Sequence, residues 1–217
     1  MRTVLRISSI LLFISLTASA LGYFLLYKPA SKSIKKDFGF DPANKTGASK
    51  VLGEKLESVS AKLKAFSVSK GYNRRIAFLV DMSIVSGRRR FFVYNMEKDS
   101  IELAGLVTHG YGSQKPGVEF SNVPGSYCSS PGKYKVGKDY QGRFGLAYKL
   151  YGLDKTNDKA FERFVVLHAH DCVPVEEVDP LNICESQGCP TVAPAFLQKL
   201  KAYIDVSDKP ILLNIFQ

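Results

Sequence analysis

The apolar positions follow three different patterns along the chain. Residues 7–27 form a largely apolar run. Further on, apolar residues recur at steps of four, three, four and three, which predicts an amphipathic helix with one apolar stripe: Leu52, Leu56, Val59, Leu63 and Phe66. From Arg75 onward, short runs rich in β-branched and aromatic residues alternate with Gly and Pro turns. The pattern therefore predicts a hydrophobic segment, a helix and a β-rich body.

The β-rich body divides into seven expected strands and two expected helices. A turn at 86–88 joins the first two strands as a hairpin, and the helices are expected at 157–163 and 194–204. Short strands with frequent turns predict a mainly β fold with a few helices, built as a sandwich or barrel. The expected strands are 76–80, 91–94, 101–107, 133–136, 146–150, 164–167 and 211–216.

The N-terminal segment carries two competing targeting signals. Arg2 and Arg6 precede the apolar run, and Ala18-Ser19-Ala20 offers a small-residue cleavage site. The run of 21 residues is also long enough to span a bilayer, which needs about 20. We expect a signal peptide or membrane anchor over 1–27 and the β-rich body over 73–217. Between them, residues 28–72 should form a basic linker and the amphipathic helix, and the linker part is the polar stretch 30–49.

The positive charge is concentrated at the N-terminus. The chain has a formal net charge of +10, of which +8 falls in residues 1–70 and +2 in the remainder. A basic arm next to a hydrophobic segment suits an anionic membrane surface or a cell-wall polymer, although it equally suits a linker that is kept soluble. We therefore expect membrane contact through the N-terminal segment and no nucleic-acid partner.

The candidate chemistry lies in Ser186-Gln187-Gly188-Cys189 and in His168-Ala169-His170 upstream. A cysteine is a useful nucleophile only as thiolate, and an imidazole within reach commonly removes the proton. The apolar run before His168 is expected to deliver this histidine at a strand end, and Gly188 permits a tight turn that presents Cys189.

These residues resemble the L,D-transpeptidase catalytic domain (YkuD-like) family, in the branch with Ser-x-Gly-Cys-Pro, because Pro190 follows the cysteine. The resemblance covers roughly residues 75 to 193. The chain departs from the family pattern at Ala169, where the family usually has Gly after the histidine, and at Pro190-Thr191, where the better-known branch has an Arg. Further blocks that carry the resemblance are 77–81, 86–87, 90–94, 107–113, 120–122, 125–126, 129–134, 140–142, Gly145, 152–154 and 157–158.

The resemblance implies acyl transfer on peptidoglycan stem peptides, without a cofactor. Cys189 would attack a peptide carbonyl to form a thioester, with His168 as general base. An amine of a neighbouring stem would resolve the thioester in a transpeptidase, and water would do so in an L,D-carboxypeptidase. The implied location is the periplasm or cell envelope. Supporting roles are expected for His170 as reserve base, Ser186 and Gly188 in the turn, and His109, Ser121 and Asn122 in substrate binding.

Four cysteines in an exported chain permit disulfides. If Cys189 stays free, only one pair forms among Cys128, Cys172 and Cys184, and Cys172–Cys184 is the simplest choice because a loop must return from His170 toward Cys189. Free buried thiols are the alternative. Two other functions compete with the enzyme: a wall-binding module without activity, and a zinc site built from His168, His170, Cys172, Cys184 and Cys189, whose spacing matches no common zinc motif.

Overall fold

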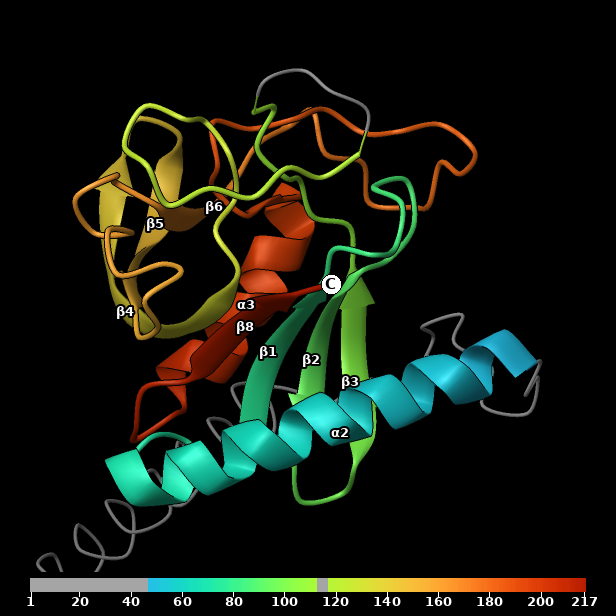
Figure 1. The fold of residues 1–217 in the computed structure, drawn as a ribbon, viewed down its shortest axis with the longest axis vertical. Coiled ribbons are helices and arrows are strands. Elements are labelled where there is room, and N and C mark those ends of the chain that lie inside the picture. The colour runs from blue at the N-terminus through green and yellow to red at the C-terminus, as the bar shows by residue number, and fades with distance from the viewer. Residues whose placement is uncertain (1–46, 113–116) are drawn as a thin grey trace, which may run out of the picture. The chain divides into compact units, whose positions relative to one another are not determined.

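Eight strands form one hydrogen-bonded sheet, and two helices pack against it, in the residues that the computed structural model describes, 47–112 and 117–217 (Figure 1). The predicted signal or anchor and most of the predicted linker lie outside these residues. The elements are α2 (Gly47–Lys70), β1 (Ile76–Asp81), β2 (Phe91–Asn95), β3 (Ser100–Gly105), β4 (Gly132–Gly142), β5 (Gly145–Gly152), β6 (Val166–Ala169), β7 (Thr191–Val192), α3 (Pro194–Asp205) and β8 (Leu212–Phe216).

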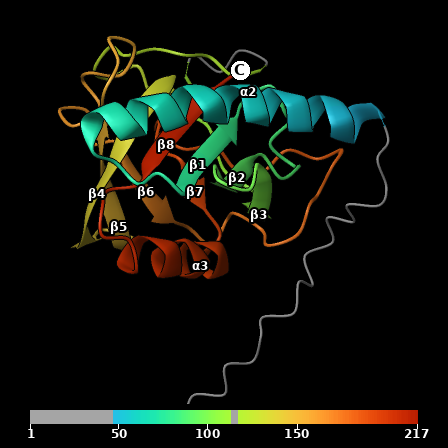
Figure 2. The same ribbon diagram turned by 90° about the horizontal axis from the view of Figure 1, so that it is seen from below.

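Strand β1 is buried along its whole length because a helix covers each face of the sheet. Ala77 and Leu79 point to one face and pack with Leu56 and Leu63 of α2, which confirms the predicted apolar stripe. On the other face, residues of β1 and β2 reach α3 through a chain of aromatic contacts: Phe78, Phe91 and Phe196. Figure 2 shows α2 and α3 on opposite sides of the strands.

The sheet returns toward its own first edge. The strand order is β3-β2-β1-β8-β4-β5-β6-β7, so β3 and β7 are its two ends. Val107, just beyond β3, nevertheless forms an antiparallel bridge with Val192 of β7, and the amide of Thr108 donates to the carbonyl oxygen of Thr191 at 2.9 Å. The mainly β, barrel-like fold class is therefore confirmed, and the closure places β7 between β6 and Val107.

The sequence predicted most strands correctly and two local features wrongly. The expected helix at 157–163 is a series of turns, because Asn157 uses its side chain to bind the amide of Asp154 and the carbonyl oxygen of Lys133. The expected strand at 164–167 begins at Val166 instead. Phe164 has a φ of 56° and is 83% exposed, so it cannot belong to a buried strand.

Helix α2 also begins earlier than expected, at Gly47, so the last residues of the predicted linker are helical. Its Lys55 binds both carboxylate oxygens of the buried Asp81, at 3.0 and 2.9 Å. Across residues 47–112 and 117–217, none of the helices has the length and apolar character that a membrane crossing requires.

Candidate active site

The segment Ser186–Cys189 is a tight turn held by the hydroxyl of Ser186. This hydroxyl donates to the carbonyl oxygen of Cys189 at 2.7 Å and accepts from the amide of Gly188 at 3.1 Å. Gly188 has a φ of 104°, and a Cβ there would lie 2.6 Å from the carbonyl oxygen of Cys128. Glycine is needed at this position for both reasons. The Gly188 amide is thus already bonded within the turn.

His168 lies in β6, and its ring is fixed at both nitrogens. Nδ1 is 3.0 Å from the carbonyl oxygen of Ala169, which can only accept, so Nδ1 carries the proton. Nε2 therefore holds the lone pair and accepts from the hydroxyl of Thr191, at 3.0 Å. Burial and the neighbouring His170 lower the pKa of His168, against the opposing effect of the Ala169 hydrogen bond. The ring is neutral near pH 7 and has the lone pair that a base requires.

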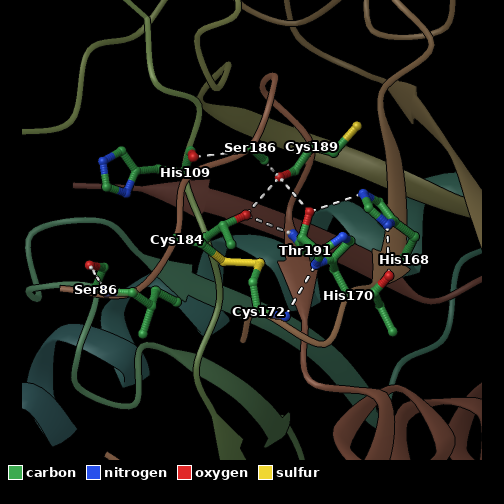
Figure 3. The surroundings of a disulfide bond; sticks show 12 residues. Ser86, His109, His168, His170, Cys172, Cys184, Ser186, Cys189 and Thr191 are labelled. Carbon is green, nitrogen blue, oxygen red and sulfur yellow. Dashed lines mark hydrogen bonds between the residues drawn. A yellow bond between two sulfur atoms is a disulfide. The ribbon is translucent and has the colours of Figure 1, made fainter. Parts of the chain in front are cut away.

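Cys189 is the last residue of the turn and leads through Pro190 into β7. Its sulfur is half-buried and lies 3.8 Å from the carbonyl oxygen of Phe164. Thr191, which pairs with His168 across β6 and β7, also lies 3.4 Å from the Cys189 carbonyl oxygen. In Figure 3 the thiol and the His168 ring lie on the same side of Thr191, away from the disulfide.

Burial raises the pKa of the Cys189 thiol, while a backbone hydrogen bond at Val166 and the positive charge of Arg163 lower it in part. Two neutral groups therefore face the site near neutral pH, a thiol and an imidazole. Deprotonation of the thiol by His168 would have to accompany substrate binding, since catalytic hydrogen bonds often tighten only in the complex.

His170 is more exposed than His168, and both rings contact Phe144. Phe144 stacks on His168 at 5.3 Å between ring centres and meets the edge of His170 at 5.4 Å. The two histidines therefore share a face of the extended segment. Nδ1 of His170 accepts from the amide of Cys172 at 3.1 Å, so this nitrogen is occupied by the chain itself.

The three predicted substrate-binding residues lie in different surroundings. His109 is buried, and its Nδ1 accepts from Arg90 at 2.9 Å, which together with burial lowers its pKa to about 4. Figure 3 shows this ring on the other side of Ser186 from the thiol. The Ser121 carbonyl oxygen accepts from Arg163, whose guanidinium also lies against Gly188, and the Asn122 amide donates to Asp158 at 2.6 Å.

Cys172 and Cys184 form a disulfide, as predicted, and Cys128 and Cys189 are free. The disulfide joins the segment that follows His170 to the one that precedes Ser186 (Figure 3). It also overturns the zinc alternative, because two of its five ligands are consumed. Among the described residues, no group of three or more His, Cys, Asp and Glu side chains is arranged to hold a metal ion.

Three residues of the site escaped the sequence analysis: Thr191, Arg163 and Phe144. Each contacts a residue that is distant in the sequence. Thr191 bonds to His168 across β6 and β7, Arg163 connects a turn to a distant loop, and Phe144 reaches His168 from the tip of the β4–β5 hairpin. The available signal was Pro190-Thr191, at the place where the better-known branch of the family has an Arg after the cysteine.

A family model for the L,D-transpeptidase catalytic domain matches residues 49–211. The match covers most of the chain, and the chain therefore belongs to the L,D-transpeptidase catalytic domain family. A search of curated proteins finds no match.

Several solved structures resemble the chain at low identity. The helical cell shape determining protein Pgp2 from Campylobacter jejuni is 13% identical, with a TM-score of 0.44 over 66% of this chain and 48% of that one. A mutant L,D-transpeptidase from Enterococcus faecium is 12% identical, with a TM-score of 0.42 over 65% and 50%. An L,D-transpeptidase from Mycobacterium smegmatis is 12% identical, with a TM-score of 0.39 over 66% and 59%. This chain spans about half the length of the first two, and family membership rests on the family model alone.

Proposed function

We propose that this chain is an L,D-transpeptidase that transfers acyl groups between peptidoglycan stem peptides through a Cys189 thioester. The observation that carries the proposal is the contact between the candidate base and Thr191, the second residue after the candidate nucleophile. The hydroxyl of Thr191 lies within hydrogen-bond distance of Nε2 of His168 and near the carbonyl oxygen of Cys189. The His168 ring thus lies beside the first residue of β7, two positions after Cys189, and this supports the proposal in a domain of this family.

The proposed reaction has two half-reactions. The Cys189 sulfur attacks the carbonyl carbon before the terminal D-residue of a tetrapeptide stem, and its proton passes to His168. His168 then protonates the departing amine of the D-residue, which leaves a thioester on Cys189. The amine of a neighbouring stem attacks the thioester, gives up its proton to His168 and restores the thiol. With water as acceptor, the same enzyme would act as an L,D-carboxypeptidase.

A location in the cell envelope fits the disulfide. Cys172 and Cys184 form a disulfide, and disulfides persist in oxidising compartments. Cys128 and Cys189 stay free, so the proposed nucleophile is not consumed by pairing. We propose that the chain is exported to the periplasm or cell envelope, where its peptidoglycan substrate lies. The membrane contact through residues 1–27 remains a prediction from the sequence.

The test is turnover of tetrapeptide stems by the full chain, with products identified by mass. Cys189→Ala should remove all turnover and leave the circular dichroism spectrum unchanged. Cross-linked dimers support transpeptidation, and tripeptides without cross-links support the carboxypeptidase. No turnover by the wild-type chain would contradict both and favour a wall-binding module.

The chain supplies its own control for this test. Cys128 is the other free cysteine, and its sulfur is buried against the carbonyl oxygen of Ser126 at 3.4 Å. Cys128→Ser should therefore keep most of the turnover. Turnover that survives in Cys189→Ala and disappears in Cys128→Ser would overturn the assignment of the nucleophile.

A further inference from the structure

Arg163 places a guanidinium against the backbone of the cysteine turn. Its Nη2 lies 3.3 Å from the position that a Cβ on Gly188 would occupy. Gly188 directly precedes Cys189, so this cation is next to the proposed nucleophile. Its positive charge lowers the pKa of the Cys189 thiol, in opposition to burial, which raises it.

The same side chain ties residues 121–130, here called the clamped loop, to the cysteine turn. Nη1 donates to the carbonyl oxygen of Ser121 at 2.9 Å and contacts the hydroxyl of Ser130. Nη2 donates to the carbonyl oxygen of Cys128 at 2.7 Å and lies 3.4 Å from the hydroxyl of Ser126. The Cys128 carbonyl oxygen is also the atom that leaves no room for a side chain at Gly188. Arginine therefore fixes the spacing between the loop and the turn.

The charge of Arg163 is not neutralised by these contacts. Its partners in the described part of the chain are carbonyl and hydroxyl oxygens, which carry no net charge. A cation that is partly withdrawn from water acts more strongly on its neighbours than an exposed one. The position next to Gly188 directs this effect at the atoms of Cys189, where acylation creates negative charge first on sulfur and then on the carbonyl oxygen of the substrate.

We propose that Arg163 is a positioning residue for Cys189. The Arg163 side chain holds the clamped loop against Gly188 and supplies positive charge that favours the thiolate and the oxyanion. The proposal rests on the proposed function, in which Cys189 is the nucleophile. It separates two contributions of one side chain, its geometry and its charge. Lysine keeps the charge but cannot donate to the Ser121 and Cys128 carbonyl oxygens with a planar fork, and glutamine removes the charge.

The test is the pH profile of alkylation by iodoacetamide in the full chain, followed at Cys189 by peptide mass so that Cys128 is counted separately. Arg163→Gln should move the midpoint of the profile upward by about one pH unit, which is about a tenfold slower reaction at neutral pH. Arg163→Lys should keep the wild-type midpoint and lower the turnover of stem peptides. Lys159→Gln removes a charge at an exposed position of the same turn segment and should match the wild type in both measurements.

A folded Arg163→Gln variant with the wild-type midpoint would overturn the proposal. So would an Arg163→Lys midpoint raised as far as that of Arg163→Gln, because geometry alone would then explain the effect. If Arg163→Gln does not fold, an Arg163→Lys midpoint raised by about one pH unit above that of the wild type overturns the proposal. Alkylation does not depend on turnover, so failure of the proposed function would show separately, as turnover that persists in Cys189→Ala.

Discussion

The hydroxyl of Thr191 lies 3.0 Å from Nε2 of His168, and the two residues are register partners in the parallel pair β6 and β7. The contact occupies the only ring nitrogen that can act as a base, since Nδ1 is bonded to the Ala169 carbonyl oxygen. Thr191, two residues after Cys189 in the chain, thus orients the lone pair of His168.

Replacing Thr191 by valine should lower kcat by about tenfold, the value of one neutral hydrogen bond in a transition state. Valine has nearly the same shape but no hydroxyl, so the imidazole loses the donor that holds Nε2. Thr191→Ser keeps the hydroxyl and should retain most of the wild-type kcat. The measurement is steady-state turnover of stem peptides, and equal kcat values for the valine and serine variants would show that the hydrogen bond does not matter.

His168→Ala should slow acylation by about 10²- to 10⁴-fold, the usual contribution of a general base. His170→Ala should slow it only a few-fold, because His170 is exposed and its Nδ1 accepts from the amide of Cys172. Both variants lose a contact with the Phe144 ring, so each controls for the packing effect of the other. Single-turnover formation of the acyl-enzyme, measured by intact mass, gives the ranking. The reverse order would identify His170 as the base.

The fold class could be predicted because the strands are coded locally. Runs such as 76–80 and 91–94 are apolar, short and bounded by turn residues, and they became β1 and β2. Strand β7 has only Thr191 and Val192, too few residues for any periodic signal, and it forms because β6 and Val107 lie on either side of it. The turns at 157–163 could not be predicted either, since the bond from Asn157 to Lys133 depends on β4.

Local motifs in the sequence contain the proposed nucleophile and base, and the cysteine spacing led to the disulfide. Their environment could not be read in this way. The ring of His109 turns inward because the buried Arg90 donates to it, and Arg163 acts on a loop more than thirty residues away in the chain. Charge and burial at Cys189 therefore come from segments that meet only in the folded structure.

Acid should destabilise this protein between pH 6.5 and about 4. Burial lowers the pKa of His109 from 6.5 to about 4 and also lowers that of His168. In this range the unfolded chain binds protons that the folded chain does not, so the free energy of unfolding falls as the pH falls and is regained as the pH rises. Urea titrations at several pH values measure this slope. His109→Gln should make it shallower, and an unchanged slope would contradict the assignment of His109.

The same directions predict separate pH profiles for turnover and for alkylation. Turnover needs neutral His168, so the turnover rate should fall only below pH 6.5 and should have reached its full value at neutral pH. Alkylation of the resting enzyme needs free thiolate, and burial raises the pKa of Cys189, so this reaction should rise only in the alkaline range. Coincident profiles would indicate a preformed thiolate–imidazolium pair in place of two neutral groups.

Gly188→Ala should disable the site more than its small size suggests. Alanine at a φ of 104° is strained, and its Cβ would lie 2.6 Å from the Cys128 carbonyl oxygen, which Arg163 holds in place. The turn or the clamped loop must therefore move, and we expect a loss of at least about 2 kcal/mol in unfolding free energy together with most of the turnover.

Gly71→Ala is the matched control for this prediction. Gly71 has a φ of 78° and follows the end of α2, and no atom lies within 4 Å of the position that a Cβ would occupy, so alanine there adds backbone strain without a collision. It should lower the unfolding free energy by about 1 kcal/mol and leave turnover unchanged. Equal losses of stability in the two variants would mean that the backbone conformation alone, and not the contact between Gly188 and the Cys128 carbonyl oxygen, fixes the cysteine turn.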